Sequence, residues 1–166
     1  MNTGRHSHSP TTRDDAALVA AFENGTLPHE DWNHEAHLRV AFCYLSQHAF
    51  EEAMERIRAG LKNYLSAKEI INTATQGYHE TMTQLWMHVI AALMAGHAGE
   101  RTKQSLLQKN PTGSAEFIER NAFLLEKSLW RMFYSRRQMV SIRAKQEFVP
   151  PDITPLPSFD DAKIPR

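Results

Sequence analysis

Apolar residues recur at intervals of three and four along most of the chain, and this periodicity restricts the fold more than any other feature. In residues 51–67 the stripe consists of Met54, Ile57, Leu61 and Tyr64. Such spacing places side chains on one face of an α-helix, because a helix turns about 100° per residue. No segment alternates apolar and polar residues as a half-buried strand does. The sequence therefore predicts an all-α fold.

Start and stop signals place further helices. Asn33 and Ser114 are residue types that cap helix starts, and Gly25 and Gly96 stand where helices are expected to end. The additional helices expected span residues 13–24, 34–49, 78–96, 100–110, 115–135 and 136–148. With residues 51–67 they make four long segments and three short ones, and the predicted fold is a single-domain bundle of four to six helices.

The two ends of the chain differ from the bundle, which is expected at residues 13–149. Residues 1–12 are polar and predict a disordered lead. Residues 150–166 are proline-rich and predict an extended tail. This tail either packs on the bundle or hangs free.

Composition excludes several classes of protein. The 166 residues suffice for one compact domain, and Lys+Arg and Asp+Glu balance at 19 each, so no general attraction to nucleic acid is expected. The single cysteine, Cys43, allows no internal disulfide, which fits a reducing compartment. We expect Cys43 to be a small residue of the core. Neither a secretory signal nor a membrane-spanning apolar run is present. We therefore expect a cytoplasmic protein without nucleic-acid or membrane partners, and self-association stays open.

Histidines gather at two of the expected helix starts. His34 and His37 are three residues apart in "NHEAH", so they share one face of their helix. His79 stands in "GYHETMTQLW" on the same face as Met82, which points toward the expected core. His88 is nine residues from His79 and falls on roughly the opposite side, which excludes it from a common site.

The expected topology brings these histidines together. Short connections make neighbouring helices antiparallel. The helices expected at 34–49 and 78–96 are separated by one helix, so their first turns lie at the same end of the bundle. That end would hold His34, His37 and His79 with the carboxylate of Glu80 beside them. Three neutral imidazoles suit a divalent transition metal such as Zn, Fe, Ni or Cu. We predict these three histidines as metal ligands and Glu80 as a fourth ligand or an acid/base.

The predicted function is that of a metal-dependent enzyme acting on a small polar or anionic molecule. Helix N-termini favour an anionic group on such a ligand. Tyr44, Thr83 and Tyr134 are expected to line the binding pocket. Hydrolysis, group transfer and oxygen chemistry remain equally open.

Two other functions are compatible with the same residues. The histidines and helix N-termini could hold an anionic ligand in a non-catalytic protein without metal. The prolines of residues 150–157 could dock on a partner, which would make the chain an interaction module. Each site residue also has a purely structural interpretation, since histidines at helix starts bond loop carbonyls and capping and packing account for Glu80 and Thr81.

Three segments, "WNHEAHLRVAFCYL", "GYHETMTQLW" and "FYSRRQMVSIRAKQEFVPPDITPLP", together resemble a family of small, uncharacterised bacterial all-helical proteins. The resemblance covers residues 18–157, and it carries no assigned reaction. It implies that the family pattern includes His34, His37, His79, Glu80, Tyr134 and Ser135. His88 and Cys43 do not match that pattern.

Overall fold

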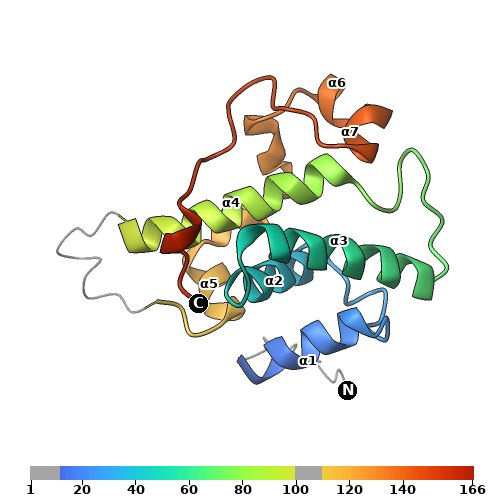
Figure 1. Ribbon diagram of the computed structural model, residues 1–166. Helices are drawn as coiled ribbons and strands as arrows, with labels where there is room; N and C mark the ends of the chain where they lie inside the picture. Colours follow the sequence, from blue (N-terminus) through green and yellow to red (C-terminus); the bar gives the residue numbers. More distant parts are fainter. Residues whose placement is uncertain (1–11, 100–109) are drawn as a thin grey trace, which may run out of the picture.

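Helices and irregular segments, with no strand, make up residues 12–99 and 110–166, which the computed structural model describes (Figure 1). The predicted all-α class is therefore confirmed. The disordered lead and the helix expected at 100–110 fall almost wholly outside the described residues. Within these residues, none of the helices combines the length and apolar character that a membrane crossing requires.

The four longest helices of the described residues follow the periodic segments of the sequence. They are α1 Thr12–Glu23, α2 His34–Leu45, α3 Phe50–Ala67 and α4 Glu80–Gly99. Asn33 caps α2 as expected, since its side chain accepts a hydrogen bond from the backbone N–H of Ala36 at 3.0 Å. The expected end of α4 at Gly96 is wrong: the helix continues to Gly99, because an isolated glycine is tolerated inside a helix.

The C-terminal part consists of short helices where two longer ones were predicted. They are α5 Ser114–Arg120, the 3₁₀ helices η2 Ala122–Leu125 and η3 Lys127–Met132, α6 Arg136–Met139, α7 Ile142–Gln146 and the 3₁₀ helix η4 Asp161–Lys163. The predicted helix 115–135 breaks at Asn121, whose side chain donates to the carbonyl of Phe117 at 2.8 Å. The predicted helix 136–148 is interrupted by Ser141, which caps α7 through the N–H of Ala144. In both places a polar side chain competes with the helical backbone bonds.

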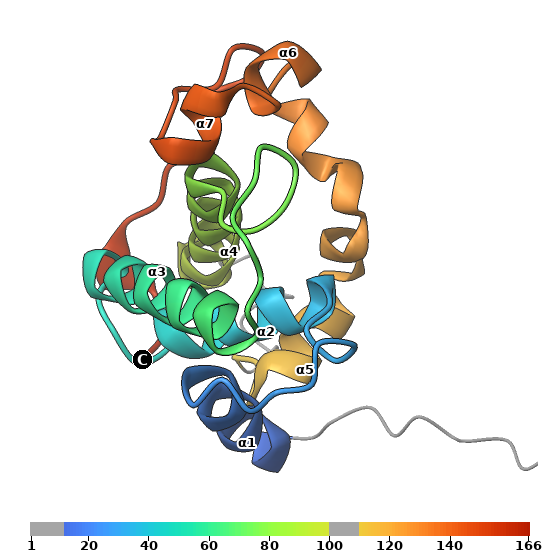
Figure 2. The same cartoon turned by 90° about the vertical axis from the view of Figure 1, so that its right-hand side faces the viewer.

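Helix α2 forms the centre of the bundle. Every residue from Leu38 to Leu45 is buried, because α1, α3, α4 and α5 all pack against it (Figure 2). Cys43 is one of these residues, and burial raises the pKa of its thiol to about 12. The cysteine is therefore a protonated core residue near neutral pH.

A buried polar cluster fixes α1 and α5 on α2. The guanidinium of Arg39 donates to Oγ of Ser114 at 2.7 Å and to Oδ1 of Asp15 at 2.5 Å. The same carboxylate accepts the backbone N–H of Ser114 at 2.8 Å, at the first residue of α5. Because the buried charge is paired and hydrogen-bonded, three helices must keep one relative position.

The C-terminal tail packs on the bundle and does not hang free. Ile164 is buried, and the ring of Phe159 lies 4.8 Å from that of Phe50. Oδ1 of Asp161 accepts the backbone N–H of Phe50 at 3.1 Å, so the tail supplies the cap that Ala49 cannot give to α3. Figure 1 shows this segment running beside α4 toward the start of α3.

Candidate functional site

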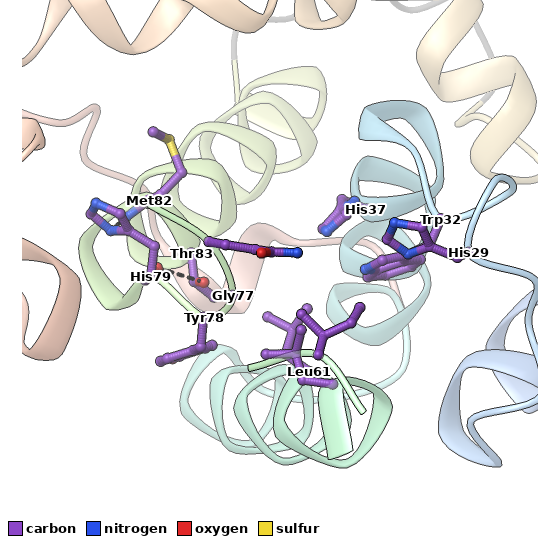
Figure 3. A pocket seen from close by; sticks show the side chains of 12 residues that line it. His29, Trp32, His37, Leu61, Gly77, Tyr78, His79, Met82 and Thr83 are labelled. Carbon is purple, nitrogen blue, oxygen red and sulfur yellow. Dashed lines mark hydrogen bonds between the residues drawn. The ribbon is translucent and has the colours of Figure 1, made fainter. Parts of the chain in front are cut away.

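A pocket of ≈ 260 Å³ lies between the start of α2, the second half of α3 and the start of α4 (Figure 3). Figure 3 shows Trp32 and His37 on one side of it and His79, Met82 and Thr83 on the other. The described residues that line it are His29, Trp32, His37, Leu61, Leu65, Ile70, Gln76, Gly77, Tyr78, His79, Met82 and Thr83. None of these residues is an aspartate, glutamate, lysine or arginine, and most of the lining is apolar.

The loop between α3 and α4 forms one wall of the pocket through Ile70 and residues 76–79. Gly77 allows its fold, because its φ is +91° and a Cβ there would lie 2.6 Å from Oδ1 of Asn72. Lys145 on α7 holds the loop from outside, since its Nζ donates to the carbonyls of Gln76 at 2.9 Å and Tyr78 at 2.7 Å. The wall is thus anchored by a helix that does not itself line the pocket.

His37 presents a hydrogen-bond acceptor in this pocket. Its Nδ1 lies 2.6 Å from the backbone carbonyl oxygen of Asn33, which can only accept, so Nδ1 carries the proton. Its ring centroid lies 3.8 Å from that of Trp32. Burial lowers the pKa of His37 to about 4, against the opposing effect of the Asn33 carbonyl. The ring is therefore neutral near pH 7, and Nε2 carries a free lone pair.

His79 also lines the pocket, but both of its ring nitrogens have partners. Nδ1 accepts the backbone N–H of Met82 at 3.2 Å, which makes His79 the side-chain cap of α4. Nε2 donates to the carbonyl of Met139, the last residue of α6, at 3.0 Å. Burial lowers the pKa of His79, which keeps this doubly bonded ring neutral.

His34 lies away from the pocket. Its Nε2 is 2.8 Å from the carbonyl oxygen of Leu124 in η2, and its ring stands edge-on to Trp86 at 4.7 Å between centroids. Burial lowers the pKa of His34, and the neutral ring donates this bond. Its contact joins the start of α2 to a segment 90 residues later in the chain.

The structure does not bring the three predicted metal ligands together. Within residues 12–99 and 110–166, no three His, Cys, Asp or Glu side chains are grouped so as to hold a metal ion. The helix starts do meet at one end of the bundle, as the topology predicted, and His37 and His79 share a pocket. The rings nevertheless turn toward different backbone carbonyls.

Glu80 points away from the pocket, toward α3. Its carboxylate accepts hydrogen bonds from Nη2 of Arg58 at 2.7 Å, from the hydroxyl of Tyr78 at 2.5 Å and from the side-chain amide of Gln84 at 3.1 Å. Burial alone would raise the pKa of Glu80, but these hydrogen bonds outweigh it and lower the pKa. The residue predicted as ligand or acid/base is thus an ionised group with three side-chain partners.

The "YHET" segment ties three parts of the fold to the start of α4. Glu80 accepts hydrogen bonds from Arg58 on α3 and from the hydroxyl of Tyr78, and His79 bonds Met139 on α6. Thr81 is fully buried, and its hydroxyl donates to the carbonyl of Glu147 at 2.9 Å and accepts the N–H of Val149 at 3.1 Å. The concentration of polar side chains at a helix start therefore has a structural cause.

Of the three predicted pocket residues, Thr83 lines the pocket, and its hydroxyl donates to the carbonyl of His79 at 2.9 Å. Tyr44 lies elsewhere and donates to Glu23 at 2.8 Å. Tyr134 is fully buried and donates to the carbonyl of Val149 at 2.9 Å. These two expectations are corrected: each tyrosine is an internal tie between segments.

Sequence reasoning missed several residues of the lining. Trp32 directly precedes the α2 cap, and a large aromatic residue beside a predicted helix start was a signal that could have found it. Ile70 and Gln76 lie in a loop without periodicity, so no pattern marked them. Leu61 was expected in the core stripe of residues 51–67 because it is apolar, and Leu65 was not singled out.

Comparisons of the chain with protein-family models, with curated proteins and with solved structures return no match.

Proposed function

We propose that the protein binds a small, uncharged, largely apolar molecule in the pocket between α2, α3 and α4. The observation that carries this proposal is the chemistry of the lining, in which no carboxylate, ammonium or guanidinium group is present. An ionised ligand would lose its hydration there without gaining a charged partner, which is costly. Concave, mainly apolar pockets with a few polar groups are the usual binding places of small molecules.

This proposal differs from the anionic ligand that the helix starts suggested. At the start of α4, the side chain of His79 already accepts the N–H of Met82. The neutral state of His37 adds no positive charge to the pocket near pH 7. Both observations support an uncharged ligand.

The metal-dependent enzyme remains a competing proposal. A metal at His37 Nε2 would need further ligands. His79 would have to give up a bond to Met82 or Met139 to supply one, and His34, whose Nε2 is held by the carbonyl of Leu124, does not line the pocket. These contacts favour binding of an organic ligand without metal.

The test is an NMR titration of the full chain with indole as probe. Indole is expected to shift the side-chain N–H resonance of Trp32 and to leave that of Trp130, which does not line the pocket. Leu65→Trp places a large side chain at a half-buried pocket position and should abolish the shift. Ile71→Trp adds the same side chain at an exposed position outside the pocket and should retain it.

Elemental analysis of the untagged protein separates the two proposals. Near-stoichiometric transition metal that is lost in both His37→Ala and His79→Ala would overturn metal-free binding. Metal-free protein that binds indole at Trp32 would reject the metal site. An indole titration without any change at Trp32 would contradict the proposed pocket.

A further inference from the structure

We propose that His37 selects the ligand of this pocket, and that it favours apolar molecules bearing an N–H or O–H donor, such as an indole or a phenol. This inference rests on the proposed function and names the chemical class of its ligand.

The orientation of the His37 ring is fixed from two sides. Nδ1–H donates to the carbonyl of Asn33, one turn back along the chain, and Trp32 packs against the ring. Because Nδ1 faces the backbone carbonyl of Asn33, Nε2 lies on the side of the ring that faces away from that carbonyl. Nε2 makes no hydrogen bond with any residue of the described part of the chain. It is therefore a positioned acceptor that no described residue of the protein satisfies.

The other polar side chains near the start of α4 are already engaged within the protein. His79 uses both ring nitrogens, the Thr83 hydroxyl donates its proton to the His79 carbonyl, and the Tyr78 hydroxyl donates to Glu80. Gln76 and His29, the other polar side chains of the lining, belong to exposed residues, whereas His37 is half-buried. Among the described residues of the lining, His37 Nε2 is thus the half-buried acceptor that a bound molecule must satisfy.

Selection follows from the cost of covering this atom. A molecule that fills the pocket removes water from Nε2, and without a donor it leaves the acceptor unpaired in apolar surroundings. A molecule with a donor replaces the lost bond and keeps the same apolar contacts. Loss of one such neutral bond corresponds to about a tenfold difference in affinity.

The experiment compares indole with benzofuran, a bicycle of the same shape that has an oxygen in place of the N–H. In wild-type protein, NMR titration should show that indole binds about tenfold more tightly than benzofuran. His37→Phe keeps an aromatic ring beside Trp32 but removes the acceptor, so the two affinities should become equal. His37→Leu serves as a second acceptor-free variant if the phenylalanine disturbs folding.

Two further variants separate selection from general damage. His37→Gln offers a carbonyl oxygen and should restore part of the preference for indole. His48→Phe exchanges a histidine outside the pocket and should keep the full preference. A structural role of His37 would weaken both probes equally and leave their ratio unchanged.

The outcomes distinguish this inference from the proposed function. Equal binding of both probes by wild-type protein, or an unchanged ratio in both acceptor-free variants, overturns the inference while the pocket function stands. No binding of either probe overturns the proposed function and the inference together. A preference for indole that disappears with the acceptor supports both.

Discussion

Arg58 on α3 and Glu80 at the first residue of α4 form an ion pair, with Nη2 of the guanidinium 2.7 Å from Oε1 of the carboxylate. The arginine also donates through Nε, at 3.1 Å and 3.2 Å from the two carboxylate oxygens. Tyr78 and Gln84 complete the set of donors. The pair joins α3 to α4, and neither residue lines the pocket, so its loss should affect stability before it affects ligand binding.

Glu80→Gln should lower the free energy of unfolding by about 2 kcal/mol at pH 7, because Arg58 loses its charged partner in a mostly buried place. The pKa of Glu80 is lowered in the fold, so its contribution is complete above the ordinary value of 4.5 and disappears as pH falls through the lowered value. Urea unfolding at several pH values measures both effects. Glu147→Gln, which breaks an exposed pair with Arg143, is the control and should cost less than about 0.5 kcal/mol.

Thr81→Val should destabilise the protein by about 2 kcal/mol. The buried hydroxyl bonds both the carbonyl of Glu147 and the N–H of Val149, and valine leaves both backbone groups without that partner. Thr83→Val is the matched control and should cost below about 1 kcal/mol, because its hydroxyl bonds a carbonyl of its own helix that already accepts the Thr83 N–H. Equal effects in thermal or urea unfolding would contradict this role of Thr81.

His37→Phe should flatten the pH dependence of stability between pH 6.5 and about 4. In the unfolded chain His37 takes up a proton near pH 6.5, whereas in the fold burial delays this to about pH 4, so stability falls as pH falls through this range. Removing the histidine should reduce the slope by up to one proton, about 1.4 kcal/mol per pH unit. His34 and His79 also have lowered pKa values, so in the variant they still make the free energy of unfolding depend on pH.

The control for this pH experiment is His29→Ala, which removes an exposed histidine and leaves His34, His37 and His79, which are half-buried. Urea unfolding of both variants from pH 7 to pH 4 gives the slopes. An unchanged slope in His37→Phe would mean that this ring is accessible to protons in the folded state.

Asp161→Ala should cost about 1 kcal/mol, the usual effect of losing a helix cap. Its carboxylate accepts the N–H of Phe50 at the start of α3 and also pairs with Arg166. Asp160→Ala is the neighbouring control, since Asp160 bonds the N–H of Ala162 inside the tail and does not reach α3. A smaller effect at Asp161 than at Asp160 in urea unfolding would show that the tail does not stabilise α3.

Lys145→Met should loosen the loop that forms one wall of the pocket. The ammonium group bonds the carbonyls of Gln76 and Tyr78, and methionine keeps most of the side-chain volume without these bonds. Amide hydrogen exchange of residues 70–78 should become faster, while that of α2 stays unchanged. Lys163→Met, on the tail, is the control and should leave the loop's exchange at the wild-type rate.

The candidate site could be predicted in part. The first turns of α2 and α4 meet at one end of the bundle, and His37, His79 and Thr83 line a common pocket there. Two features of the sequence predict this arrangement. The lengths of the connections fix the direction of each helix, and the apolar stripes fix the face that turns inward. His34 and Glu80 share the same helix starts but reach different neighbours.

The sequence by itself determined the long helices of the described residues, the Asn33 cap and one inward face of α2, because helical periodicity and capping depend on residues a few positions apart. Only the tertiary structure decided what each polar side chain binds. His34 reaches a carbonyl 90 residues away, and His79 one 60 residues away. A pattern shows the face on which a ring lies, whereas the atom it meets depends on distant segments that pack there once the chain has folded.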